Sequence, residues 1–221
     1  MAWFTADFDQ FFKDLAKNNH KEWFDANRKR YEGSVKNPFE AFVAEAITRI
    51  AKHDKTVRIE PKEAIFRINK DIRFSKDKTP YKLACSAIIS SAGRKDHTTP
   101  GIYFEFGPES LKFFGGAYSP EKEQILSIRA AIMRDPKGFR KVIEGKTFSS
   151  KFDGVKGEAN KLLPPEFKAA VIKEPLIANK QFYVGAERPA KLATDPKLMD
   201  EMMDHYLAMR PFNLWLAAAM K

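Results

Sequence analysis

The sequence has a single cysteine, Cys85, and no CxxC motif. One thiol cannot form an intramolecular disulfide, so a disulfide framework is excluded and a reducing compartment is expected. The four histidines lie far apart and none belongs to an HExxH motif, so the sequence predicts no metal site and no cofactor. Cys85 lies in an apolar run, which favours a small buried side chain over a nucleophile.

Motifs for nucleotide binding and acyl transfer are also missing, since there is no Walker loop, no dinucleotide fingerprint and no GxSxG turn. The longest apolar run, residues 214–220, is far shorter than the roughly 20 residues of a transmembrane helix. The first twelve residues lack the basic and apolar regions of a signal peptide. We therefore expect a cytoplasmic protein with no membrane partner, and the sequence carries no signal for an oligomeric state.

The composition is that of a basic, folded protein. The chain has 221 residues, of which 43% are hydrophobic and 31% charged, and this predicts one globular domain spanning residues 1–221. Nineteen phenylalanines predict a core built on large rings. The net charge of +10 favours anionic partners, either small molecules or nucleic acid, although a basic surface also serves solubility alone.

Hydrophobic spacing changes twice along the chain. Apolar residues recur at helical spacing up to residue 50, alternate over residues 64–114 and return to helical spacing after Ser119. Strands are expected at residues 66–75, 83–90, 101–107 and 111–114, with a further short strand at residues 181–185. Because the links are mostly short, the sequence predicts an α+β fold with an antiparallel sheet of four or more strands (about 64–114), flanked by N- and C-terminal helices.

The helix expected over residues 20–32 has two interpretations. Trp23, Phe24 and Tyr31 share one face at helical spacing and are interpreted as core. In the alternative, Trp23, Asn27 and Tyr31 line a pocket.

Residues 66–82, FRINKDIRFSKDKTPYK, carry the densest set of charged groups. On a strand, Arg67, Asn69, Asp71 and Arg73 would form one row with about 7 Å between neighbours. Arginine forks and asparagine amides suit an oxyanion held in one orientation. In the alternative, Asp71 neutralises both arginines in a structural network. The predicted ligand-binding residues are Arg67, Asn69, Asp71, Arg73, Ser75, Lys76, Lys78 and Lys82.

These residues leave three functions open. The first is a binding module for a phosphate-bearing or other anionic ligand. The second is an enzyme acting on a phosphorylated or carboxylated small molecule, with Asp71 as general base or metal ligand and Tyr103 as a donor. Glu105 shares the alternate positions of its strand with Tyr103 and is a further catalytic candidate. The third is an interaction module for nucleic acid or an acidic partner.

Four stretches form a distinctive pattern: NNHKEWFDANRKRYE, FRINKDIRFSKDKTPYK, YFEFGPESLKFFGGAYSPEKEQILSIRAAI and NKQFYVG. Each resembles a segment of the domain of unknown function 2461 family, and the resemblance spans nearly the whole chain. It implies a single domain of about this length, and it assigns no reaction.

Overall fold

The structure is a computed structural model that describes residues 2–96 and 98–221. The chain divides into two compact units. Unit 1 comprises Met1–Arg94, Tyr103–Phe113 and Glu187–Met203, and unit 2 comprises Lys95–Ile102, Phe114–Ala186 and Asp204–Lys221. The division falls within several strands and within the last helix, so neither unit is a continuous stretch of sequence. The single domain expected from the sequence stays a prediction.

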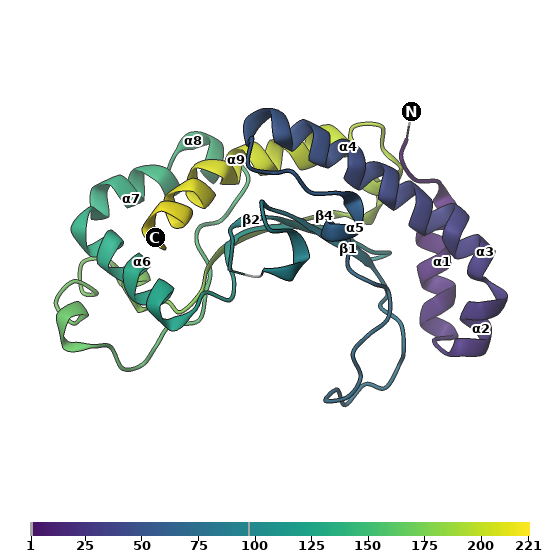
Figure 1. Cartoon of the computed structure of the whole chain (residues 1–221), viewed down its shortest axis with the longest axis horizontal. Coiled ribbons are helices and arrows are strands. Elements are labelled where there is room, and N and C mark those ends of the chain that lie inside the picture. The colour runs from purple at the N-terminus through teal and green to yellow at the C-terminus, as the bar shows by residue number, and fades with distance from the viewer. Residues whose placement is uncertain (1, 97) are drawn as a thin grey trace. The chain divides into compact units, whose positions relative to one another are not determined.

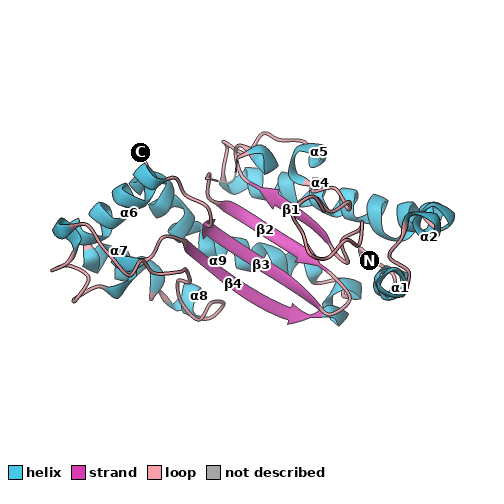
Figure 2. Ribbon diagram, turned by 90° about the horizontal axis from the view of Figure 1, so that it is seen from below, coloured by secondary structure: helices cyan, strands magenta, loops and turns pink. Residues whose placement is uncertain are grey.

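Four antiparallel strands form one open sheet in the order β1-β2-β3-β4 (Figure 2). They are β1 (Cys85–Ile89), β2 (Gly101–Phe106), β3 (Ser110–Ala117) and β4 (Phe182–Pro189). The predicted α+β fold, with an antiparallel sheet and helices from both ends of the chain, is confirmed. Burial alternates along β2 and β3, because successive side chains of a strand point to opposite faces of the sheet.

The expected strand at residues 66–75 is wrong, and β4 supplies the fourth strand of the sheet instead. Residues 66–82 form a loop with two arms that pair only locally. The Phe66 N–H donates to the Ser86 carbonyl at 2.9 Å, and the Lys82 N–H donates to the Ile68 carbonyl at 2.8 Å. Pairing ends near Pro80, which has no N–H to donate. We call residues 66–70 and 80–82 the arms of this 66–82 loop, and residues 71–79 its tip.

Unit 1 begins with helices, drawn in purple and blue in Figure 1. They are α1 (Ala6–Lys17), α2 (Lys21–Ala26), α3 (Arg28–Tyr31), the π-helical turn η1 (Glu32–Lys36) and α4 (Asn37–His53). The short helix α5 (Pro61–Ala64) precedes the 66–82 loop, and the 3-10 turn η2 (Gly93–Lys95) follows β1. Helix α1 buries its apolar side chains along one stripe, which consists of Phe8, Phe11, Phe12 and Leu15.

Phenylalanine rings build the core of unit 1. Phe39 and Phe42 of α4 contact Phe104 and Phe106 of β2, and the Phe42 and Phe106 ring centroids are 5.3 Å apart. Each such pair stabilises the fold by about 0.5–1.5 kcal/mol beyond the burial of the rings. Because α4 covers this face, the alternate residues of β2 lie on the opposite face of the sheet.

Unit 2 contains α6 (Lys122–Arg134), α7 (Pro136–Ile143), α8 (Lys146–Ser149) and residues 204–219 of α9 (Leu198–Ala219). Its 3-10 turns are η3 (Pro165–Phe167) and η4 (Pro175–Ala178), whereas η5 (Ala190–Thr194) belongs to unit 1. The N-cap of α6 is Glu121, and the Gln124 side chain accepts the Glu121 N–H at 2.8 Å. In the described ranges, no helix has the length and apolarity that crossing a membrane requires.

Asn19, in the turn between α1 and α2, fixes the 66–82 loop to the helices of unit 1. Its side-chain amide donates to the Tyr81 carbonyl at 2.9 Å, and its side-chain oxygen accepts the Tyr81 N–H at 3.1 Å. The buried Tyr81 ring stacks on Phe24 of α2, with ring centroids 4.0 Å apart. One asparagine side chain therefore bonds to both backbone groups of Tyr81, as a neighbouring strand would.

Replacing Asn19 by alanine removes both of these bonds. Since each hydrogen bond contributes about 0.5–1.5 kcal/mol, we expect Asn19→Ala to lower the free energy of unfolding by about 1–3 kcal/mol. Urea denaturation measures this change. Asn160→Ala is the matched control, because it removes the side chain of an exposed asparagine in unit 2. Equal stability of the two variants would contradict the role given to Asn19.

Candidate functional site

Unit 1 contains a pocket of about 240 Å³ between its helices and the first arm of the 66–82 loop. Three parts of the unit supply its lining. Helices α3, η1 and α4 supply one wall, residues 62–68 supply a second, and β1 and η2 supply a residue each. The full lining is Tyr31, Val35, Lys36, Phe39, Glu40, Lys62, Ile65, Phe66, Arg67, Ile68, Cys85 and Arg94.

The helical wall follows from residue spacing. Tyr31, Val35 and Phe39 are four residues apart, so they share one side of the helical run from α3 to α4. The π-helical turn η1 lies inside this run, and such turns are frequent at functional sites. Burial raises the pKa of Tyr31 above its ordinary value, so its hydroxyl stays protonated and able to donate at neutral pH.

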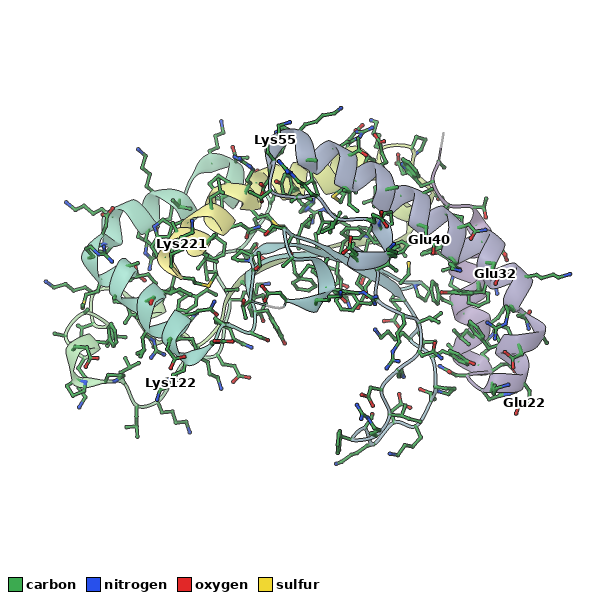
Figure 3. All side chains as sticks on the ribbon, viewed as in Figure 1. Glu22, Glu32, Glu40, Lys55, Lys122 and Lys221 are labelled. Carbon is green, nitrogen blue, oxygen red and sulfur yellow. The ribbon has the colours of Figure 1, made fainter. Side chains whose placement is uncertain are left out.

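Four basic side chains line the pocket: Lys36, Lys62, Arg67 and Arg94. The one acid in the lining is Glu40 of α4, which Figure 3 labels. Lys62 forms an ion pair with Glu60 at 2.7 Å. The other three basic side chains form no hydrogen bond or ion pair with any residue in the ranges 2–96 and 98–221. The pocket therefore offers three cations to an anion.

Gly93 brings Arg94 to the pocket. Its φ is 63°, a conformation that other residues rarely adopt, and a Cβ at this position would overlap the Glu63 carbonyl of α5. The Ser90 hydroxyl accepts the Gly93 N–H at 3.1 Å and fixes the turn. Only glycine permits this close approach of η2 to α5, which carries Lys62.

The structure divides the predicted ligand-binding residues between the pocket, the arms and the tip. Arg67 lines the pocket, whereas Asn69 and Lys82 lie in the arms. The predicted row along a sheet strand is wrong, because residues 66–75 form no strand of the sheet. The remaining predicted residues all lie in the tip, namely Asp71, Arg73, Ser75, Lys76 and Lys78.

The two acids of the tip are engaged in ion pairs. Arg73 donates to both carboxylate oxygens of Asp71, at 3.0 and 2.6 Å, and this pair is exposed to solvent. These bonds lower the pKa of Asp71 to about 2, which makes it a poor general base at neutral pH. Asp77 pairs with Lys70 at 2.7 Å. The structural network considered from the sequence thus has Arg73 as its bonded partner, while Arg67 acts on Asp71 only through its charge.

Tyr103 and Glu105, the other catalytic candidates, lie together on the sheet face opposite α4. The Tyr103 hydroxyl donates to Glu105 at 2.9 Å, and Lys112 of β3 donates to the other carboxylate oxygen at 3.3 Å. The Tyr103 ring also contacts Phe66, which lines the pocket. The Lys82 Nζ lies over the Phe66 ring, 5.5 Å from its centroid, and burial lowers the pKa of Lys82. In the described ranges, no group of three His, Cys, Asp or Glu side chains could hold a metal ion.

Each of the two interpretations of the helix expected over residues 20–32 fits some of its residues. Phe24 is buried in the core, and Trp23 packs against Phe11 of α1. Asn27 donates to the Trp23 carbonyl at 2.9 Å, so it has a structural role. Tyr31 lines the pocket, as the second interpretation expected.

Sequence reasoning missed the other basic residues of the pocket. Lys36 and Lys62 resemble ordinary exposed lysines, and nothing in their spacing connects them to Arg67. For Arg94, the preceding glycine was the available signal, because a glycine in a turn indicates a close backbone approach.

Cys85 lines the pocket from β1, and the surroundings of its thiol do not favour the nucleophilic thiolate. Burial raises the pKa of the thiol well above its ordinary value, and Sγ lies 3.7 Å from the Phe106 carbonyl oxygen. A protonated thiol is a weak nucleophile, because the thiolate is the reactive species. Cys85 is half-buried and not fully buried as expected from the sequence.

We expect Cys85 to react slowly with Ellman's reagent in the native protein at pH 7.5. Each unit by which the pKa rises lowers the thiolate fraction roughly tenfold, so the native rate should be at least tenfold below that in urea. The absorbance of the released thionitrobenzoate measures the rate, and Cys85→Ser provides the blank. Equal rates in the folded and unfolded protein would contradict this assignment.

Two comparisons with known proteins bear on identity. No curated protein matches the sequence. The model of the family described as "Conserved hypothetical protein (DUF2461)" matches residues 7–215. This range includes the pocket, the 66–82 loop and all four strands. The match covers far more than half of the chain, and the chain therefore belongs to the DUF2461 family.

Proposed function

We propose that this protein binds a small phosphate-bearing or carboxylated ligand in the pocket of unit 1. In this proposal Arg67 forms the principal contact with the anion, because a guanidinium can donate two parallel hydrogen bonds to one oxyanion. Lys36 and Arg94 supply further positive charge from the helical wall and from η2. We also propose a cytoplasmic location, which a chain with a single unpaired cysteine supports.

The observation that carries the proposal is the convergence of three unpaired cations on one concave site. Lys36, Arg67 and Arg94 come from separate segments of the sequence, and all three line the pocket. Like charges gathered in a cleft repel one another and raise the local concentration of anions. A bound anion would offset this repulsion and accept hydrogen bonds from the N–H groups of the three cations.

The rest of the lining supports a ligand that carries an apolar body beside its anionic group. Val35, Phe39 and Ile65 provide apolar surface, while Glu40 and the Tyr31 hydroxyl can bind polar substituents. The volume of about 240 Å³ lies below the roughly 300–1,000 Å³ of pockets for drug-sized ligands. A single phosphorylated metabolite fits this description better than a dinucleotide.

We expect Arg67→Ala to weaken the binding of inorganic phosphate or a sugar phosphate by about 10- to 150-fold, because a charge-assisted hydrogen bond contributes about 1.5–3 kcal/mol. Arg67→Lys should recover only part of the affinity, since lysine keeps the charge and loses the fork. Isothermal titration calorimetry measures the dissociation constants.

Arg58→Ala is the matched control, because Arg58 is an exposed arginine of unit 1 outside the pocket lining. If Arg58→Ala and Arg67→Ala reduced the affinity equally, net charge and not the pocket would account for binding. Unchanged affinity in Arg67→Ala would refute the proposed site.

An enzyme acting on the same ligand is the second candidate, and the bonded pair of Tyr103 and Glu105 favours it. Tyr103 contacts Phe66 of the pocket lining and donates to Glu105, and Tyr103 is a protonated donor because burial raises its pKa. Glu105 is the candidate base, in place of Asp71. We expect Glu105→Gln to retain ligand binding and to lose any turnover found by incubating the wild-type protein with phosphorylated metabolites. Turnover that survives Glu105→Gln would exclude this role.

A further inference from the structure

The tip of the 66–82 loop presents an aromatic ring to solvent. Phe74 is 95% exposed, whereas the core phenylalanines of unit 1 are buried. Within unit 1, the loop extends from the sheet on the side away from α4 (Figure 1). Its arms are held by the Asn19 bonds to Tyr81, so the ring sits on a supported projection. A large apolar side chain that folding leaves in water is available to a partner.

Positive charge surrounds this ring. The Arg73 guanidinium lies over Phe74, 5.9 Å from the ring centroid. Lys76 is exposed and forms no hydrogen bond or ion pair with another described residue. Lys78 donates to the Ile72 carbonyl at 2.9 Å, which leaves its charge uncompensated. The acids of the tip are already paired, so the charge presented around Phe74 is cationic.

We propose that the tip binds single-stranded nucleic acid, with Phe74 stacked on an unpaired base and Lys76 and Lys78 on the adjacent phosphates. An aromatic ring flanked by basic side chains is the combination that single strands require, because every base has a flat face and every linkage carries a negative charge. Arg73, which Asp71 holds through two hydrogen bonds, lies over the Phe74 ring.

A membrane surface fits the tip less well. Segments that bind the membrane interface present an extended apolar face, whereas the neighbours of Phe74 in the tip include Ser75, Asp77 and Thr79. A duplex also fits less well, because its bases are already stacked on one another. One exposed ring suffices for a single unpaired base.

This inference is independent of the proposed pocket. The tip residues are absent from the pocket lining, and the pocket residue Arg67 lies outside the tip. Either function can therefore fail in experiment while the other is retained.

Fluorescence anisotropy with a fluorescein-labelled, mixed-sequence single-stranded oligonucleotide tests the proposal. We expect affinity to fall as salt is raised from 50 to 200 mM, since phosphate contacts release about one counterion each. Phe74→Ala should raise the dissociation constant about 5- to 150-fold, the range reported for loss of one base stack. Phe74→Trp should retain affinity, because it keeps an aromatic platform.

Leu162→Ala is the matched control, because Leu162 is 89% exposed in unit 2 and contributes no ring. The melting temperature of Phe74→Ala should equal that of the wild type, because the ring is exposed in the folded protein. Arg67→Ala should leave oligonucleotide binding intact.

Three results would overturn the proposal. Equal affinity of the wild type and Phe74→Ala for the oligonucleotide would exclude stacking. Equal affinity for single strands and the matching duplex would indicate a general charged patch. If the wild type bound phosphatidylserine vesicles and did not bind the oligonucleotide, the tip would be assigned to a membrane surface.

Discussion

The arrangement of unit 1 depends on the bonds between the Asn19 side chain and the backbone of Tyr81. These bonds replace the neighbouring strand that the arms of the 66–82 loop lack, and the Tyr81 ring stacks on Phe24 beside them. The loop is further attached by the Phe66 N–H bond to the Ser86 carbonyl and by the ring contact of Phe66 with Tyr103. The first arm forms one wall of the pocket, so the position of Arg67 depends on the same bonds.

The tip and the first arm of the 66–82 loop differ in how their charged side chains are paired. In the tip, each acid is paired with a nearby base: Asp71 with Arg73, and Asp77 with Lys70. In the first arm, Arg67 faces the pocket with no bonded acid among the described residues. A loop that is rich in both signs of charge therefore presents two cationic surfaces. One is concave and lined with apolar side chains, and the other is convex and carries an exposed ring.

Much of the fold could be predicted from the sequence, because it follows from local spacing. Helical spacing up to residue 50, the nineteen phenylalanines and the strand expected at residues 101–107 predicted helices, a core built on rings and the sheet. Alternation alone could not distinguish a strand from a loop arm at residues 66–75, since pairing there stops near Pro80. The pocket could not be predicted, because Lys36, Lys62 and Arg94 meet Arg67 only in the folded chain. The exposure of Phe74 was hidden for the same reason, since its place in the alternation matches that of core residues.

An NMR titration shows most directly whether the cations of the unit 1 pocket bind one anion. Inorganic phosphate and a sugar phosphate would be added to ¹⁵N-labelled protein while the backbone amide and arginine side-chain signals are recorded. We expect saturable shifts at Lys36, Arg67, Arg94 and their neighbours, with a larger response to the sugar phosphate. Shifts confined to the tip, or linear shifts spread over all exposed lysines, would contradict this expectation.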